Sequence, residues 1–205
     1  MTRIDIINHL IQKYGYKNYL EIGVRTNNDC FNHINIENKV GVDPGYENPN
    51  ERYDYRMESD EFFVQVRSGQ TEFAKDHKWD IIFIDGLHLA DQVHRDILNS
   101  LEHLDQNGTI VMHDCCPPFE NASREVNTGL WCGTVWKAYM WFRNNRPDLF
   151  MTCVDDDFGV GIIQRGKQEL APNTNPMYEY NNFFANRSEY LNMITPEQFL
   201  NMFPQ

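Results

Sequence analysis

The sequence predicts a single doubly wound α/β domain with a mostly parallel central sheet. Short apolar runs alternate with helical patterns through most of the 205 residues. Runs as apolar as IIFI at 81–84 and TIVM at 109–112 are typical of parallel strands covered by helices on both faces. The strands expected at 149–154 and 160–165 are separated only by residues 155–159, too few for a helical crossover, so these two should pair antiparallel.

The first half of the chain predicts one helix and then five strands. Thr2 can cap the helix with Asp5 three residues later, and Gly15 ends it. Residues 90–108 carry the clearest later helical period, with Asn107 and Gly108 as its expected stop. The expected strands are 19–24, 39–44, 53–57, 80–86 and 108–114.

The second half begins with a helix over 133–145 and continues with the two antiparallel strands. Trp131 and Trp136 belong to an aromatic stretch that we interpret as core packing. Residues 166–205 are rich in Asn and aromatic residues and end in a helix that Thr195 caps. We expect one domain: an N-terminal helix (1–18), a cofactor-binding core (19–165) and a C-terminal extension (166–205), docked by its Tyr and Phe side chains and not acting as a lid.

Charge and cysteine content exclude several classes of protein. The net charge is −12, so the surface should repel phosphate backbones and anionic lipid, and we expect neither nucleic acid nor membrane as a partner. The five cysteines form no C-x-x-C pair, which favours reduced thiols. The N-terminus lacks the apolar core of a signal peptide, so we expect a cytoplasmic protein. A homodimer is left open as its oligomeric state.

Acidic residues follow each predicted strand of the parallel part of the sheet. In such sheets ligands bind at the carboxyl ends of the strands. The residues at these ends are Glu21 and Gly23, then Asp43, Ser59 and Asp60, Asp85, and finally His113 and Asp114. Acids after five successive apolar runs therefore indicate a ligand site at this edge.

Gly23 and Asp43 fit the binding of a nucleoside. Gly23 lets the backbone come close to a ligand, and Asp43, twenty residues later, can accept hydrogen bonds from both hydroxyls of a ribose. The alternative is that Asp43 only begins the turn in DPGY. That alternative explains the proline and glycine but not the strand before them.

Six segments of the chain together resemble a known family. The segments are YLEIGV, VGVDP, WDIIFIDGLHLADQVHRDI, NGTIVMHDCCP, GTVWKAY and DDDFGVGII, which span residues 19 to about 165. In this order they are similar to the class I S-adenosylmethionine-dependent methyltransferases, within the small-molecule O-methyltransferase-like group that has an I-D-G-x-H motif. The resemblance implies a Rossmann-like, seven-stranded sheet in which the last strand is antiparallel.

The resemblance also implies roles for single residues. Glu21 and Gly23 would form the first cofactor motif and Asp43 would bind the ribose. Ser59 and Asp60 would lie near the adenine, and Asp85 beside the reacting methyl group. The family's first loop usually carries more glycines, where this chain has the residues RTNN at 25–28. Asparagine can adopt the left-handed conformation that glycine would supply there.

Asp85, His88, His113 and Asp114 should meet in one crevice, because they follow two strands expected to be neighbours. They could hold a Mg²⁺ ion through Asp85 and Asp114, as some related enzymes do, although Cys115 stands where a further oxygen ligand is expected. Without a metal, His88, or next to it His113, would be the general base. His88 could instead merely cap the following helix, and Cys115 and Cys116 are better interpreted as buried small residues than as zinc ligands.

The function that we expect is transfer of a methyl group from S-adenosylmethionine to a hydroxyl of a small polar acceptor, such as a sugar-containing metabolite. One alternative is a non-catalytic domain that binds the same cofactor. A nicotinamide-dependent oxidoreductase is another, but the chain lacks the G-x-G-x-x-G motif that pyrophosphate binding needs.

Overall fold

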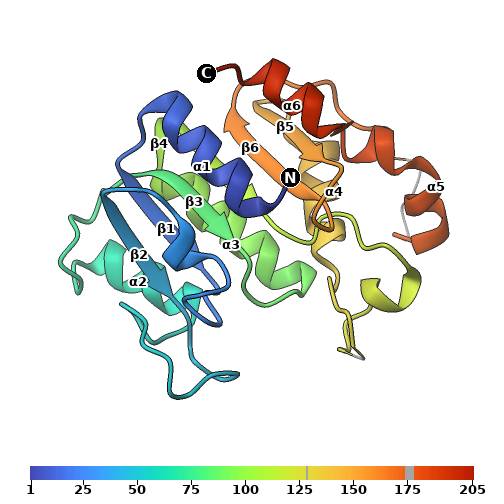
Figure 1. Ribbon diagram of the computed structural model, residues 1–205. Helices are drawn as coiled ribbons and strands as arrows, with labels where there is room; N and C mark the ends of the chain where they lie inside the picture. The colour runs from blue at the N-terminus through green and yellow to red at the C-terminus, as the bar shows by residue number, and fades with distance from the viewer. Residues whose placement is uncertain (128, 174–177) are drawn as a thin grey trace.

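The computed structural model describes residues 1–127, 129–173 and 178–205, so a part of the predicted extension lies outside the described residues. Figure 1 shows one sheet with helices on both faces. The strands are β1 (Asn18–Ile22), β2 (Asn38–Val42), β3 (Trp79–Ile84), β4 (Leu104–Met112), β5 (Leu149–Val154), β6 (Val160–Arg165) and β7 (Met193–Ile194). The helices are α1 (Arg3–Tyr14), α2 (Ser59–Ser68), α3 (Ala90–His103), α4 (Val135–Asn145), α5 (Tyr180–Tyr190) and α6 (Pro196–Met202), with short 3-10 turns η1 (Phe31–His33) and η2 (Glu120–Ser123).

The sheet has seven strands in the order β2-β1-β3-β4-β6-β5-β7, which confirms the predicted fold class. The first four strands in this order are parallel. β6 is antiparallel to both β4 and β5, as the short 155–159 connection predicts. The strand order reverses beside β1, where the connections from β1 and β3 leave the sheet in opposite directions and a crevice can open.

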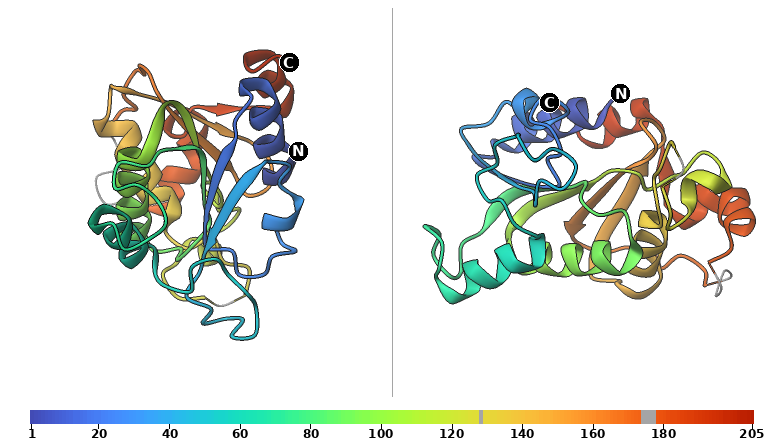
Figure 2. Two further views of the ribbon diagram at one scale, coloured as in Figure 1. Left: turned by 90° about the vertical axis from the view of Figure 1, so that its left-hand side faces the viewer. Right: turned by 90° about the horizontal axis from the view of Figure 1, so that it is seen from below.

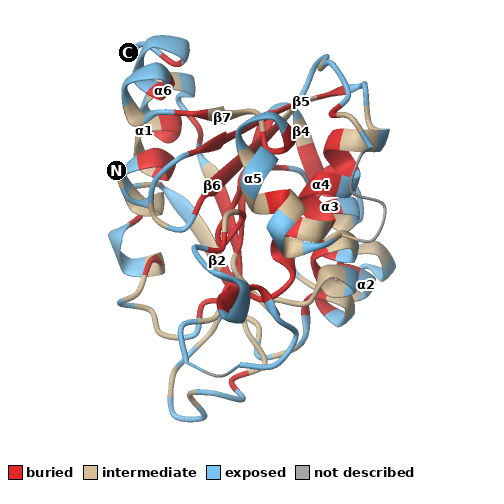
Figure 3. Ribbon diagram, turned by 90° about the vertical axis from the view of Figure 1, so that its right-hand side faces the viewer, coloured by how far each residue is buried: buried red, intermediate tan, exposed pale blue. Residues whose placement is uncertain are grey.

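Two helical layers cover the sheet. One apolar cluster packs α1 and α6 on one face, and the other packs α2 to α5 on the opposite face. Figure 2 shows the strands between these layers, and Figure 3 shows that buried residues concentrate in the strands and on the inner sides of the helices. α1 begins with a capping box in which Thr2 and Asp5 bind each other's backbone N–H groups, and it ends at Gly15 with φ 66°, both as predicted.

The predicted strand at 53–57 is wrong. Only Tyr55 forms a bridge, with Val42, and the neighbouring backbone N–H of Gly41 is instead bound by the side chain of Asp54 at 2.8 Å. The alternation of apolar and polar residues thus indicated a segment that lies beside β2. It does not form a strand, because the Asp54 carboxylate takes the position that a backbone carbonyl would hold in a longer strand.

The helix expected to end at Asn107 and Gly108 stops earlier, at His103, and the chain runs directly into β4. Gly108 lies inside β4 beside an irregularity in its pairing with β3. A Cβ at Gly108 would lie 2.8 Å from the backbone oxygen of Asp80. The glycine permits a close approach of two strands and does not end a helix.

The extension docks through its aromatic residues, as predicted. Phe183, Tyr190 and Phe199 are all buried. The ring of Phe183 lies 4.2 Å from that of Trp136, centroid to centroid, which confirms core packing for this tryptophan. The extension also supplies β7, the seventh strand, which was not predicted. No helix among the described residues is long and apolar enough to cross a bilayer.

Candidate functional site

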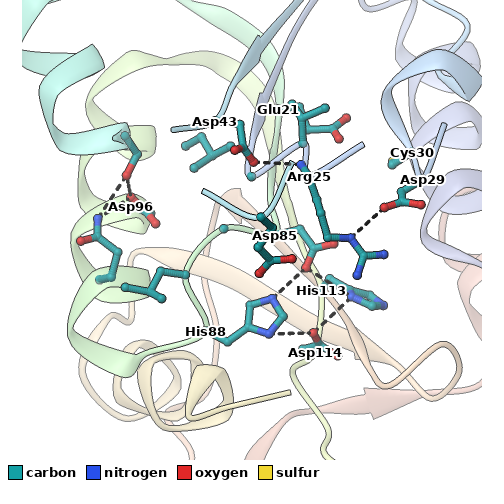
Figure 4. Close-up of a pocket in the computed structure, with 18 of the residues that line it drawn as sticks. Glu21, Arg25, Asp29, Cys30, Asp43, Asp85, His88, Asp96, His113 and Asp114 are labelled. Atoms are coloured by element: carbon teal, nitrogen blue, oxygen red, sulfur yellow. Dashed lines mark hydrogen bonds and ion pairs between the residues drawn. The ribbon is translucent and has the colours of Figure 1, made fainter. Parts of the chain in front are cut away.

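A cavity of about 600 Å³ opens at the carboxyl ends of β1 to β4. Most of the residues predicted at the strand ends line it. These are Glu21, Gly23, Asp43, Ser59, Asp85, His88, His113 and Asp114. Figure 4 shows several of them directed toward one another across the pocket. The crevice at the strand ends therefore exists and brings together eight of the nine predicted side chains or backbone positions.

Gly23 allows the end of β1 to pack closely against the end of β3. Its φ is 85°, and a Cβ there would lie 2.3 Å from the backbone oxygen of Asp85 and from the Cα of Gly86. Only a residue without a side chain can occupy this position. The glycine thus allows the backbones of β1 and β3 to pack closely at the floor of the cavity. It also leaves room for a ligand to approach the backbone there.

Glu21 is a buried acid in the wall of the cavity. The hydroxyl of Tyr19 donates a hydrogen bond of 2.5 Å to it. Burial raises the pKa of Glu21 to about 8, although the Tyr19 hydrogen bond opposes this rise. The side chain is therefore largely protonated at neutral pH and can donate a hydrogen bond.

Asp43 follows β2 and organises the two loops around it. Its carboxylate accepts hydrogen bonds from the backbone N–H of Arg25 at 2.8 Å and of Gly45 at 2.6 Å. The left-handed residue of the first loop is Arg25, with φ 52°, and not one of the asparagines as the sequence suggested. The carboxylate that binds the Arg25 N–H stabilises this strained residue, and its remaining lone pairs are available to a ligand.

Ser59 and Asp60 separate at the first turn of α2. Ser59 lines the cavity and donates a hydrogen bond of 2.6 Å to Asp96. Asp60 is not among the lining residues. It lies in an ion pair with Arg95 at 2.8 Å, and its expected contact with a ligand gains no support from this placement.

Four side chains form the cluster that we call the His88 cluster: Asp85, His88, His113 and Asp114. Nε2 of His88 lies 3.3 Å from Asp85, and Nδ1 of His88 lies 3.4 Å from Asp114. Nδ1 of His113 lies 3.4 Å from each of the two carboxylates. Asp114 has φ 59°, a strained conformation at the end of β4 that is typical of functional sites.

His113 is surrounded by carboxylates. Besides Asp85 and Asp114, the carboxylate of Asp157 lies 3.3 Å from its Nε2. Burial alone would lower the pKa of His113, but these acids raise it well above its ordinary value. His113 is therefore a cation in this arrangement and a poor acceptor of a proton, which argues against it as a general base.

His88 is held by the segment that follows η2. Its Nδ1 lies 3.1 Å from the carbonyl oxygen of Trp131, and the two rings lie 5.0 Å apart. Since a carbonyl only accepts, Nδ1 carries a proton, and Nε2, which faces the Asp85 carboxylate, is the nitrogen that can exchange one. Burial opposes the charged form, but Asp85 and Asp114 raise the pKa of His88 above its ordinary value. Trp131 thus contacts the site directly, so its interpretation as core packing was wrong. The alternative that His88 caps α3 also fails, because the backbone N–H of Ala90 at the start of that helix is bound by Thr134 Oγ1 at 2.8 Å instead.

Asp85, His113 and Asp114 offer three ligand atoms within 4.8 Å of one another. This set contains one imidazole and two carboxylates. Cys115 is not part of it, because its thiol is buried and lies 3.7 Å from the carbonyl oxygen of His113. All five cysteines are free thiols, as predicted; Cys115 is buried, as expected, whereas Cys116 is only half-buried.

Sequence reasoning missed two residues that complete the His88 cluster. Arg3, at the start of α1, binds Asp157 through its backbone N–H at 2.8 Å, and its guanidinium lies 3.9 Å from Asp85. Asp157 belongs to the acidic turn 155–159, in which Asp157, Phe158 and Gly159 all have positive φ. The run of three acids in that turn was a visible signal, but nothing in the sequence indicated that it meets the first helix.

Comparisons with known proteins agree with this fold. Residues 23–115 match the family model of a methyltransferase domain. No curated protein matches the chain by sequence. Among solved structures, an O-methyltransferase from Bacillus cereus in complex with SAH is similar at a TM-score of 0.57, with 12% identity over 80% of each chain.

Two further solved structures share the fold. TomG from Streptomyces achromogenes, an O-methyltransferase of tomaymycin synthesis in complex with SAM, aligns at a TM-score of 0.52 and 10% identity, covering 78% of each chain. The SAH-bound methyltransferase PaMTH1 from Podospora anserina aligns at 0.52 and 15% identity, covering 80% of this chain and 78% of its own. The chain therefore has the Rossmann-like methyltransferase fold, and its residues 23–115, which hold all the predicted strand-end residues except Glu21, match the family model of a methyltransferase domain.

Proposed function

We propose that this protein is an S-adenosylmethionine-dependent methyltransferase that methylates a hydroxyl group of a small molecule. The observation that carries the proposal is that Gly23, Asp43 and Asp85, from three adjacent strand ends, line one cavity together with the His88 cluster. Such a cavity can hold a nucleoside at one end and an acceptor at the other.

The nucleoside would lie between β1 and β2. Asp43 has lone pairs left after binding two backbone N–H groups, so it can accept hydrogen bonds from a ribose. Gly23 allows the rest of the cofactor to lie close to the backbone, next to Asp85. When bound, S-adenosylmethionine supplies an electrophilic methyl group on a positively charged sulfur.

The chain must then position the acceptor and remove its proton. In its neutral form His88 is suited to this, because the Trp131 carbonyl holds its Nδ1–H and Nε2, which faces Asp85, can take the hydroxyl proton. Asp85, at 3.3 Å, would stabilise the imidazolium that forms. His113, between the same carboxylates, would hold them in place.

The mouth of the cavity favours an acceptor with an apolar part. Leu87, Leu130 and Phe158 line it and are 51%, 46% and 40% exposed, so three separate segments offer apolar side chains to one ligand. A bare sugar would leave these side chains in water. We therefore propose that a sugar acceptor, if used, is a glycoside whose apolar portion contacts this rim.

A second arrangement of the same cluster includes a divalent cation. Asp85, Asp114 and Nδ1 of a neutral His113 would hold it, and it would polarise the acceptor hydroxyl. Mg²⁺, as predicted from the sequence, prefers oxygen ligands only, whereas a set with one imidazole suits Mn²⁺ or Zn²⁺ better.

Ligand binding tests the proposal against its alternatives. S-adenosylmethionine or its demethylated product should raise the melting temperature by mass action, whereas NAD should not. Stabilisation by NAD alone would favour an oxidoreductase and refute the proposal. Binding of the methyl donor without turnover on a broad panel of hydroxylated compounds would favour a non-catalytic cofactor-binding domain.

A further inference from the structure

A second buried carboxylate, Asp96 on α3, lines the cavity away from the His88 cluster. It is 1% exposed, yet it belongs to the cavity wall together with Ser59 and Gln92. Figure 4 shows it below α2, on the opposite side of the pocket from Asp114. The methyl-transfer chemistry proposed above gives this acid no role.

The hydrogen bonds around Asp96 leave one of its oxygens without a donor. Ser59 Oγ donates to Oδ1 at 2.6 Å, and Gln92 Nε2 donates to the same oxygen at 3.0 Å. Gln92 also donates to Ser59 Oγ at 3.1 Å, and its own oxygen is bound by Arg95. Among the described residues no donor is recorded for Oδ2, and this oxygen is not completely buried, so it remains available to a donor group on a ligand.

The ligand group that fits here must be a donor. Burial raises the pKa of Asp96 to about 6, against the hydrogen bonds of Ser59 and Gln92, so the carboxyl is mostly an ionised acceptor at pH 7.5. The wall between Asp43 and Asp96 includes the apolar side chains of Val42, Pro44 and Met57, which suit the flat face of a base. A base seated there would present its edge to Asp96.

We propose that Asp96 accepts a hydrogen bond from the 6-amino group of adenine and makes the site selective for adenine over 6-oxopurines. This inference rests on the proposed function, since it assumes that an adenosyl cofactor occupies the cavity. A 6-oxopurine offers a carbonyl oxygen to the same carboxylate, and two acceptors repel each other. Ser59 and Gln92 are positioning residues that hold Oδ1 and turn Oδ2 toward the ligand.

The test compares two ligands that differ only at this group, S-adenosylhomocysteine and S-inosylhomocysteine, by calorimetric titration at pH 7.5. The wild-type protein should bind the adenosyl compound about 10- to 100-fold more tightly, the loss expected for a hydrogen bond to a charged group. Asp96→Asn keeps an oxygen for Ser59 and presents an amide donor to the 6-oxo group. This variant should reduce the ratio to about 2-fold or reverse it.

Asp60→Asn is the matched control, because Asp60 lies next to Ser59 in the first turn of α2 but is paired with Arg95 outside the cavity. It should keep the wild-type ratio. Equal binding of both ligands to the wild-type protein would overturn the inference even if Asp96→Asn does not fold. If Asp96 only links α2 to α3, a folded Asp96→Asn variant should keep the wild-type ratio of the two affinities. That result would also overturn the inference. Absence of S-adenosylhomocysteine binding would instead refute the proposed function itself, and the inference with it.

Discussion

Replacement of Gly23 by alanine should lower both the stability of the fold and the affinity for the cofactor. Two causes contribute, backbone strain and close packing of β1 against β3, and a control variant separates them. At φ 85° an alanine pays left-handed strain of about 1 to 2 kcal/mol. Its Cβ would also lie 2.3 Å from backbone atoms of Asp85 and Gly86, which no side-chain rotation can relieve. Forcing the ends of β1 and β3 apart adds about 1 to 3 kcal/mol, the usual cost of overpacking. We therefore expect Gly23→Ala to lose about 2 to 5 kcal/mol of unfolding free energy.

Gly15→Ala is the matched control. Gly15 has a similar φ of 66°, but a Cβ there meets no atom within 4 Å. Urea denaturation should therefore show a loss of only about 1 to 2 kcal/mol for Gly15→Ala, with unchanged affinity for S-adenosylhomocysteine. Equal losses for the two variants, together with wild-type affinity in Gly23→Ala, would refute the close packing of β1 against β3 as the reason for the glycine.

Four further outcomes are expected. Asp43→Ala should abolish the rise in melting temperature caused by S-adenosylhomocysteine, because each hydrogen bond to a charged acceptor contributes about 1.5 to 3 kcal/mol; an unchanged rise would make Asp43 a turn residue only. His88→Ala should lower the rate on an acceptor found by screening by roughly 10² to 10⁴ with cofactor affinity retained, and full activity would exclude it as the base. The folded pKa of Glu21 is raised from 4.5 to about 8, so its contribution to stability is complete below about pH 4.5 and is lost as the pH rises through 8. Glu21→Gln should therefore flatten the fall in unfolding free energy across this range, by at most about 1.4 kcal/mol per pH unit in urea denaturation, and an unchanged slope would contradict the raised pKa. If the cluster holds a cation, Mn²⁺ titrated into chelator-treated protein should bind saturably, and Asp114→Asn should weaken that binding strongly.

The strand ends could be predicted because they depend on local patterns. Each parallel strand is an apolar run, and the residue that follows it emerges at the ligand-binding edge wherever the strand lies in the sheet. Asp43, Asp85 and Asp114 were found in this way. The same reasoning failed at 53–57, where the Asp54 side chain, and not a backbone carbonyl, binds the N–H of Gly41. The periodicity of the sequence does not distinguish a side-chain acceptor from a backbone acceptor.

The missed residues depend on contacts between distant segments. Arg3 reaches the site only because α1 lies against the turn at 155–159, and Asp96 faces the cavity only because α3 packs beside α2. Likewise Trp131 has the aromatic surroundings of a core residue in the sequence, and its contact with His88 arises from the path of the chain after β4. Such contacts carry no signature in one sequence.

The packing of α1 against α6 has a consequence for how the protein is made. His9 of α1 hydrogen-bonds to the carbonyl oxygen of Phe203 at 2.6 Å, and its ring lies 5.1 Å from that of Phe199. At about 5 to 20 residues per second, a ribosome delivers α6 roughly 10 to 40 seconds after α1. During that interval the apolar side of α1 has no C-terminal partner, and Arg3 has no turn at 155–159 to bind until late in synthesis. The nascent chain can thus form the parallel part of the sheet first, while the crevice around His88 is completed only after the turn at 155–159 has been synthesised and has met Arg3.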